Sequence, residues 1–246
     1  MKEPSLSWEK RKFESTPGSA KSPIIATKDM TRVFGSGESA VAAVNMVTLD
    51  VFPGEFLVVT GRSGSGKTTL LNLMAGLDAP TAGTVQFKGQ DLASFSESDM
   101  VTLRRHKLGF VFQSFGLMPL LSAFENVELP LHISGVSWIE RRRRATEVLE
   151  MVCLGPRARH RPYELSGGEQ QRVAIARALV SGPDVVFADE PTGELDTITA
   201  NSIGIILKDI VRQRGVTVIV ATHDQALAGM SDRAVQLEDG SLVSPA

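Results

Sequence analysis

Short hydrophobic runs alternate with helical patterns along most of the chain, and polar or glycine-rich segments separate them. The first two runs, Ile24–Phe34 and Val44–Val51, lie on either side of Gly35–Gly37 and predict a hairpin or small antiparallel sheet. Further strands are predicted at Phe56–Thr60, Thr84–Phe87 and Leu108–Phe112. Two later runs, Asp184–Glu190 and Val216–Thr222, are continuously apolar, which is typical of buried strands of a parallel sheet.

Helical patterns fill the intervals between the predicted strands. They cover Thr69–Ala75, Glu97–Arg105, Glu169–Ser181 and Thr197–Arg214. From about 114 to 165 the chain becomes rich in Leu, Glu and Arg in helical spacing, and we expect an inserted helical lobe there. A final hairpin is expected to pair residues 234–237 with 241–243 across Asp239-Gly240.

These elements predict an α/β fold with a mixed or parallel sheet, an N-terminal antiparallel β subdomain and an inserted α-helical subdomain. We expect residues 24–246 to form a single domain. Residues 1–23 mix charged residues with Ser, Pro and Gly without periodicity, and we expect a flexible tail.

Composition restricts the function classes. The chain has 246 residues, 42% of them apolar, which suffices for one large domain. A net charge of −2 gives no electrostatic reason to expect a nucleic-acid partner. The single cysteine, Cys153, excludes an internal disulfide. Neither a signal-peptide core nor an apolar run long enough to span a membrane is present in the sequence, which predicts an intracellular protein.

The segment between the Phe56–Thr60 strand and the next helix carries the first chemical motif. It reads Gly61-Arg62-Ser63-Gly64-Ser65-Gly66-Lys67-Thr68-Thr69, which matches a phosphate-binding P-loop. Glycines let successive N–H groups point into one concavity, and the following helix adds its own free N–H groups and dipole. Lys67 would reach the β- and γ-phosphates and Thr68 would bind Mg²⁺. The motif predicts a nucleoside-triphosphate site with ATP and Mg²⁺ as ligands.

Three polar residues follow the two most apolar strands. Asp189 and Glu190 end one of them, and His223 follows the other. At the carboxyl edge of the sheet, Asp189 would hold Mg²⁺ opposite Thr68. Glu190 points away from Asp189 by strand alternation and would deprotonate an attacking water. His223 would hydrogen-bond the γ-phosphate and that water.

A second helix start is also built to bind phosphate. Leu165-Ser166-Gly167-Gly168-Glu169-Gln170 places a hydroxyl and free N–H groups immediately before a helix. An ordinary helix cap without a ligand is the alternative interpretation of this segment.

Taken in order, these motifs resemble the ATPase subunit of ABC transporters from about residue 24 to residue 243. The Leu-Ser-Gly-Gly-Glu-Gln signature beside a P-loop is highly specific. Phe112–Leu121 and Glu125–Leu131 further resemble the bacterial lipoprotein-release and macrolide- or peptide-export ATPases, together with the related cell-division ATPase. The resemblance implies an ATPase that hydrolyses ATP to ADP and phosphate.

The resemblance also implies roles for individual residues. Phe34 would stack on adenine where the family usually has Tyr, and Gln113 would sense Mg²⁺ and the γ-phosphate. Asp196 would lie in a loop that crosses a dimer interface, where Glu194 departs from the usual Asn or Ala. The residues that would clasp a nucleotide bound to a second copy of the chain, in a head-to-tail dimer, are Ser166, Gly167, Gly168 and Gln170.

Two functions remain open for such an ATPase. In the first it powers export or extraction of a lipoprotein, peptide, lipid or drug through a separate transmembrane permease subunit. In the second it acts in a transmembrane signalling complex of the cell-division type. In both cases we expect a cytoplasmic protein held on the inner membrane through its partner. A groove lined by apolar residues after Gln113 would receive that partner, and ordinary core packing of the helical lobe is the alternative for part of the set. These residues are Phe115, Leu117, Met118, Leu120, Leu121 and Phe124. Soluble ABC proteins of DNA repair or translation are disfavoured, because those that resemble this chain usually carry two cassettes or a long coiled coil. A small-molecule kinase is disfavoured because it would not explain Leu165–Gln170.

Overall fold

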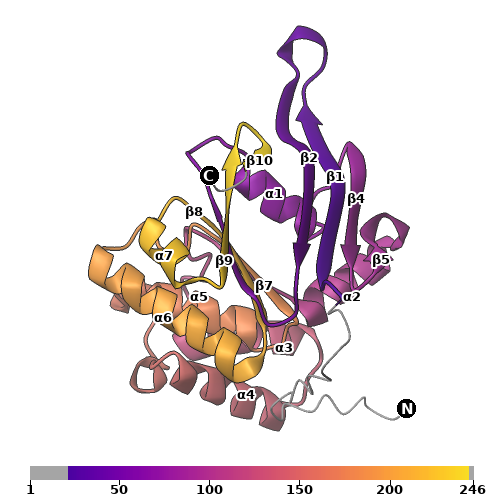
Figure 1. Ribbon diagram of the computed structural model, residues 1–246. Helices are drawn as coiled ribbons and strands as arrows, with labels where there is room; N and C mark the ends of the chain where they lie inside the picture. The colour runs from indigo at the N-terminus through magenta and orange to yellow at the C-terminus, as the bar shows by residue number, and fades with distance from the viewer. Residues whose placement is uncertain (1–21, 244–246) are drawn as a thin grey trace, which may run out of the picture.

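The computed structural model describes residues 22–243, and its strands form two sheets (Figure 1). The smaller sheet is antiparallel and has the strand order β2-β1-β4-β5. Its strands are β1 (Ile25–Phe34), β2 (Val41–Val51), β4 (Ala82–Phe87) and β5 (Gln90–Asp91). It stands beside the main sheet, with its β1–β2 end projecting beyond the rest of the molecule.

The larger sheet has the order β10-β9-β3-β8-β7-β6. All neighbouring pairs are parallel except β9 with β10, which form a C-terminal hairpin. Its strands are β3 (Phe56–Thr60), β6 (Leu108–Val111), β7 (Val185–Asp189), β8 (Thr217–Thr222), β9 (Arg233–Glu238) and β10 (Ser241–Val243). The carboxyl ends of β3, β8 and β7 therefore lie side by side at one edge.

Helices cover both faces of this sheet. Helix α1 packs between the two sheets, whereas α5 and α6 pack on the opposite face of the larger one. The helices are α1 (Lys67–Met74), α2 (Glu97–Lys107), α3 (Ala123–Ile133), α4 (Trp138–Met151), α5 (Gly167–Leu179), α6 (Thr197–Arg214) and α7 (Gln225–Met230).

Alternation along the buried strands divides the apolar interior into two parts. In β3, Leu57 and Val59 face α1 and the antiparallel sheet, and Phe56 and Val58 face α5 and α6. Strands β7 and β8 alternate in the same way. Because both faces are covered by apolar layers, every residue of β3 is buried.

The region expected as an inserted helical lobe contains α3 and α4. Apolar residues of these helices, such as Val127 and Val148, share one continuous core with Val173 of α5 and Val58 of the sheet. The lobe is thus joined to the main sheet through α5. The extent of the domain as a whole stays a prediction, and most of the expected tail, residues 1–21, lies outside the described residues.

The predicted α/β fold is confirmed, including the antiparallel subdomain and the C-terminal hairpin. Two short elements were missed because neither is long enough to show periodicity: strand β5 and helix α7. Strand β2 also begins at Val41, three residues before the apolar pattern, since its outer end is exposed.

A buried amide organises the connection between β6 and α3. Asn126 is 0% exposed and makes four hydrogen bonds to the preceding backbone. Its oxygen accepts from the Met118 N–H at 2.7 Å. Its nitrogen donates to the carbonyls of Met118, Leu121 and Ser122 at 3.1, 3.0 and 3.0 Å.

We expect Asn126→Ala to lower the free energy of unfolding by about 2–4 kcal/mol, because it leaves several buried backbone groups unpaired. Urea denaturation measures this difference. Asn45→Ala is the control, since the exposed Asn45 amide makes only a long 3.5 Å contact with Ser241. It should change stability by less than about 0.5 kcal/mol. Equal effects of the two substitutions would contradict the structural importance of Asn126.

Candidate active site

The P-loop connects β3 to α1 and packs against strand β2. Gly66 caps α1 with φ of 100°, a left-handed conformation that other residues rarely adopt. A Cβ added to Gly66 would lie 2.0 Å from the Ala43 carbonyl oxygen of β2. One added to Gly61 would lie 2.5 Å from the Leu237 carbonyl oxygen. These glycines are required because the backbone of neighbouring strands approaches the loop so closely.

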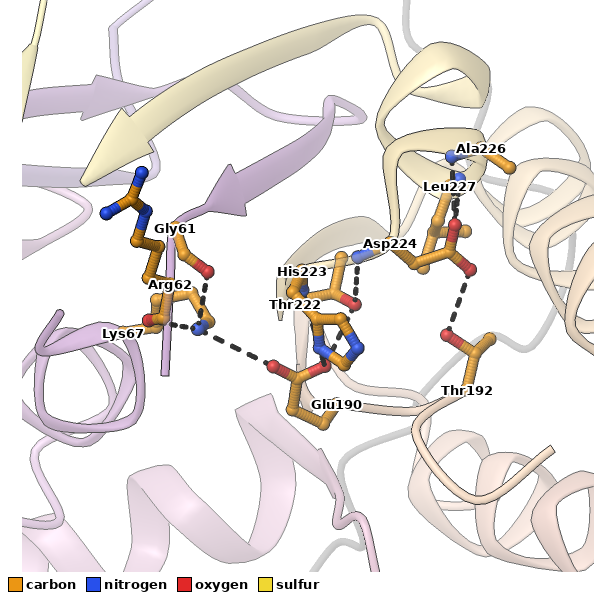
Figure 2. A network of polar contacts seen from close by, with 10 residues as sticks. All are labelled: Gly61, Arg62, Lys67, Glu190, Thr192, Thr222, His223, Asp224, Ala226 and Leu227. Carbon is orange, nitrogen blue, oxygen red and sulfur yellow. Dashed lines mark hydrogen bonds and ion pairs between the residues drawn. The ribbon is translucent and has the colours of Figure 1, made fainter. Parts of the chain in front are cut away.

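Lys67 is buried at the first position of α1, with its side chain 7% exposed. Its ammonium donates to the carbonyls of Gly61 at 2.9 Å and Arg62 at 3.0 Å. It also lies 3.6 Å from the carboxylate of Glu190 (Figure 2). The P-loop lysine and the predicted base are therefore in direct electrostatic contact.

Glu190 follows β7 and is held at the end of β8. Its φ of 46° is in the left-handed region, a backbone conformation that strand alternation does not predict. Oε2 accepts a hydrogen bond from the Thr222 hydroxyl at 3.0 Å and lies 3.0 Å from Nδ1 of His223. The backbone N–H of His223 also donates to this oxygen at 3.4 Å. The structure thus brings Lys67, Glu190 and His223 into one network.

Asp189 ends β7 on the P-loop side. Burial raises the pKa of this carboxyl above its ordinary value, and a hydrogen bond from Thr68 partly offsets that rise. Its Oδ1 is buried and has no hydrogen-bond partner among residues 22–243. The Ser65 hydroxyl in the P-loop is also buried and unpartnered in this part of the chain.

This arrangement fits a magnesium nucleotide. An orphaned carboxylate oxygen beside a threonine hydroxyl supplies two of the oxygen ligands that Mg²⁺ prefers. Among the described residues, no cluster of three or more His, Cys, Asp or Glu side chains could hold a metal by itself. Mg²⁺ bound here would therefore need phosphate oxygens and water to complete its coordination.

Gln113 lies just beyond β6 and its side chain is exposed. This side chain lies near Gly193: its Nε2 is 3.5 Å from the position that a Cβ on Gly193 would occupy.

Arg177 of α5 fixes the segment that follows Gln113, a contact that sequence reasoning missed. Arg177 donates to the carbonyls of Phe115 at 3.0 Å and Gly116 at 2.6 Å, and burial lowers the pKa of its guanidinium. Positive φ angles at both acceptor residues mark this turn, although nothing in the sequence pattern pairs it with Arg177.

The second phosphate-binding candidate lies at the start of α5. Ser166 and Glu169 form a capping box: the Glu169 N–H donates to the Ser166 hydroxyl at 3.3 Å, and the Ser166 N–H donates to the Glu169 carboxylate at 2.8 Å. Gly167 precedes Gly168, which packs so closely on α6 that an added Cβ would lie 2.3 Å from Thr199. The Gln170 amide donates to the Leu165 carbonyl at 3.1 Å.

The structure does not join this second element to the P-loop. Helices α1 and α5 pack on opposite faces of the larger sheet. No hydrogen bond or ion pair within residues 22–243 links Ser166–Gln170 with Gly61–Thr69. Ser166 is exposed, so its hydroxyl is accessible to a second molecule.

Two further predicted site residues, Asp196 and Phe34, have partners other than Lys67, Glu190 and His223. Asp196 caps α6 by accepting hydrogen bonds from the N–H groups of Ile198 and Thr199, both at 3.0 Å. Hydrogen bonds from Thr199 hold the pKa of this carboxyl below its usual range. Phe34 is 44% exposed at the end of β1, where the guanidinium carbon of Arg32 lies 4.7 Å from its ring centroid.

Comparisons with known proteins agree with this geometry. A family model described as ABC transporter matches residues 44–193. The macrolide export ATP-binding/permease protein MacB of Marinobacter nauticus is 46% identical over 221 residues, covering 90% of this chain and 34% of that protein. The lipoprotein-releasing system ATP-binding protein LolD of Geobacter metallireducens is 44% identical over 223 residues, covering 91% and 99%. The chain thus spans about a third of the macrolide exporter and nearly all of the lipoprotein-releasing relative.

A solved structure gives the same result. The dimeric ATP-binding cassette MJ0796, in a post-hydrolysis state bound to ADP and Pi, matches with a TM-score of 0.81 and 43% identity. The match covers 89% of this chain and 97% of that one. On the agreement of fold, motifs and sequence identity, the chain belongs to the ABC transporter family and has the fold of its ATP-binding cassettes.

Proposed function

We propose that this chain is the Mg²⁺-dependent ATPase subunit of an export-type ABC transporter. The observation that carries the proposal is the contact of Lys67 with Glu190 and of Glu190 with His223 at one sheet edge. A phosphate-binding cation paired with a carboxylate base, and an imidazole at hydrogen-bond distance from that base, are groups that triphosphate hydrolysis needs.

In this proposal the P-loop holds the triphosphate, and Lys67 turns from the loop carbonyls to the phosphate oxygens. Thr68, Asp189 and Gln113 would hold Mg²⁺, which would neutralise phosphate charge. Glu190 accepts a proton from water as the water oxygen attacks the γ-phosphorus, and the bond to the β–γ bridging oxygen breaks to release ADP. With Nδ1 donating to Glu190, His223 can donate to the γ-phosphate from Nε2 only as an imidazolium.

A second copy of the chain completes each site. Ser166, Gly167, Gly168 and Gln170 would contact the triphosphate held by the partner's P-loop, with Asp196 at the crossing between protomers. Support comes from the exposure of Ser166 away from the P-loop of its own chain. The dimeric state of MJ0796 is consistent with this assembly.

A membrane subunit would transmit the work of hydrolysis. Within residues 22–243 no helix is long and apolar enough to cross a bilayer. Beyond Gln113, Met118 and Leu120 are 48% and 80% exposed, whereas Leu117 and Phe124 pack against the core. We assign the exposed pair to the docking surface for that subunit, on the cytoplasmic face of the inner membrane. The relatives MacB and LolD favour a macrolide-like drug or a lipoprotein as cargo.

Glu190→Gln should lower kcat for ATP hydrolysis by about 10²–10⁴-fold, because the amide cannot accept the proton of the attacking water. ATP-dependent dimerisation, followed by light scattering, should persist. Glu150→Gln on the exposed face of α4 is the control and should hydrolyse ATP like the wild type. Rapid turnover by Glu190→Gln would disprove the assignment of the base.

Asp189→Asn should have opposite effects on stability and on metal use. The raised pKa means that the folded chain binds this proton more tightly than the unfolded chain, so wild-type stability falls as pH rises through that pKa. Asparagine does not titrate. The variant should therefore melt at a higher temperature than wild type at neutral pH without ligands, and lose that advantage in acid.

The same variant should need about tenfold or more Mg²⁺ for half-maximal ATPase activity. Calorimetry at two pH values and a Mg²⁺ titration test both expectations. An unchanged Mg²⁺ requirement would argue against Asp189 as a metal ligand.

A mixing experiment tests the two-chain site. Lys67→Ala and Ser166→Arg chains should each be inactive alone. In a mixed dimer, one site pairs the intact Lys67 with the intact Ser166, so an equal mixture should recover up to about a quarter of wild-type activity. The doubly substituted chain mixed with either variant is the control. No recovery from the equal mixture would refute a site shared between protomers.

A further inference from the structure

The antiparallel sheet ends close to the P-loop. Phe34 at the end of β1 pairs with Val41 of β2, and two residues further along β2 the carbonyl of Ala43 rests against Gly66. A nucleotide with its phosphates in the P-loop would therefore lie beside the strand end that carries Phe34. The ring of Phe34 is 44% exposed and can offer one face to a base.

The other face of the ring is covered by Arg32. The two residues are separated by one position in β1, so their side chains share a face of the strand. The guanidinium carbon lies 4.7 Å from the ring centroid, within the range of a cation–π contact. Phenylalanine has no polar atom through which hydrogen bonding could fix its ring. Instead of a hydrogen bond, the planar guanidinium of Arg32 stacked on one face restricts the motion of the ring.

Arg32 is itself anchored to the segment that follows the P-loop helix. Its Nη2 lies 2.9 Å from Oδ1 of Asp78, four residues beyond the end of α1. The same segment is fixed to β1 twice more. The Thr81 N–H donates to the Thr31 carbonyl at 2.8 Å, and the Val33 N–H donates to the Thr81 hydroxyl at 3.1 Å.

We infer that Arg32, anchored by Asp78, is a positioning residue for the nucleobase: it holds the Phe34 ring as a stacking platform at a fixed place relative to the P-loop helix. The inference rests on the proposed binding of ATP at the P-loop. Arg32 then contributes to recognition of the base and not to recognition of the phosphates. A plain surface ion pair between Arg32 and Asp78 would contribute to neither.

Binding of ATP and of inorganic tripolyphosphate, both with Mg²⁺, separates these possibilities, because tripolyphosphate has no base. By titration calorimetry, Arg32→Ala should weaken ATP binding by about three- to tenfold and leave tripolyphosphate binding unchanged. Phe34→Ala should weaken ATP binding at least as much. In the Phe34→Ala background, Arg32→Ala should have no further effect, since the platform is already lost.

Arg104→Ala is the matched control, since Arg104 donates to the Gly76 carbonyl of the same segment at 2.9 Å but does not contact the ring. It should leave the ratio of the ATP and tripolyphosphate affinities unchanged. The inference would be overturned if Arg32→Ala left the ratio of the ATP and tripolyphosphate affinities unchanged, whether or not both affinities fell. It would also be overturned if Arg32→Ala weakened ATP binding in the Phe34→Ala background as much as it does in the wild type. Failure of the wild type to bind either ligand would instead refute the proposed function.

Discussion

The contact between Lys67 and Glu190 depends on parallel strands that end in register. Thr60 of β3 pairs with Thr222 of β8, and Asp189 of β7 pairs with Ala221. The P-loop begins one residue beyond β3, the Glu190 carboxylate follows β7, and the His223 imidazole follows β8. A shift of one residue in any of these pairings would move the ion pair out of reach and reverse the faces of the buried side chains. The apolar layers on both faces of the sheet prevent such a shift.

The antiparallel sheet supports the same edge from the other side. Its strand β2 contacts Gly66 through a backbone carbonyl, and its strand β1 is tied to the segment after α1. The P-loop helix is therefore held at both ends by elements outside the larger sheet. Such support keeps the N–H groups of the loop oriented without help from a ligand, and this preorganisation lowers the cost of binding an anion.

Sequence reasoning predicted the strands and the residues immediately after them. In an α/β fold, a continuous apolar run followed by a polar residue usually indicates a buried strand that ends at the edge of the sheet. It could not find Arg177, Asn126 or the contact between Arg32 and Asp78. These residues act through the turns they hold, and the partners of Arg177 and Arg32 lie 46 or more residues away in the sequence without a shared motif. The left-handed backbone of Glu190 also escaped prediction, since the alternation of strand residues does not indicate a positive φ after β7.

The capping box at the start of α5 affects how readily this helix end can bind an external anion. The Glu169 carboxylate already accepts the Ser166 N–H, and this bond holds the pKa of Glu169 below its usual value. The helix end thus carries a tethered anion of its own. A phosphate that bound at Ser166, as proposed above, would have to compete with that carboxylate for the Ser166 N–H, so a weakly charged or poorly placed anion would gain little there. Glu169 would then set a threshold for engagement of this helix end.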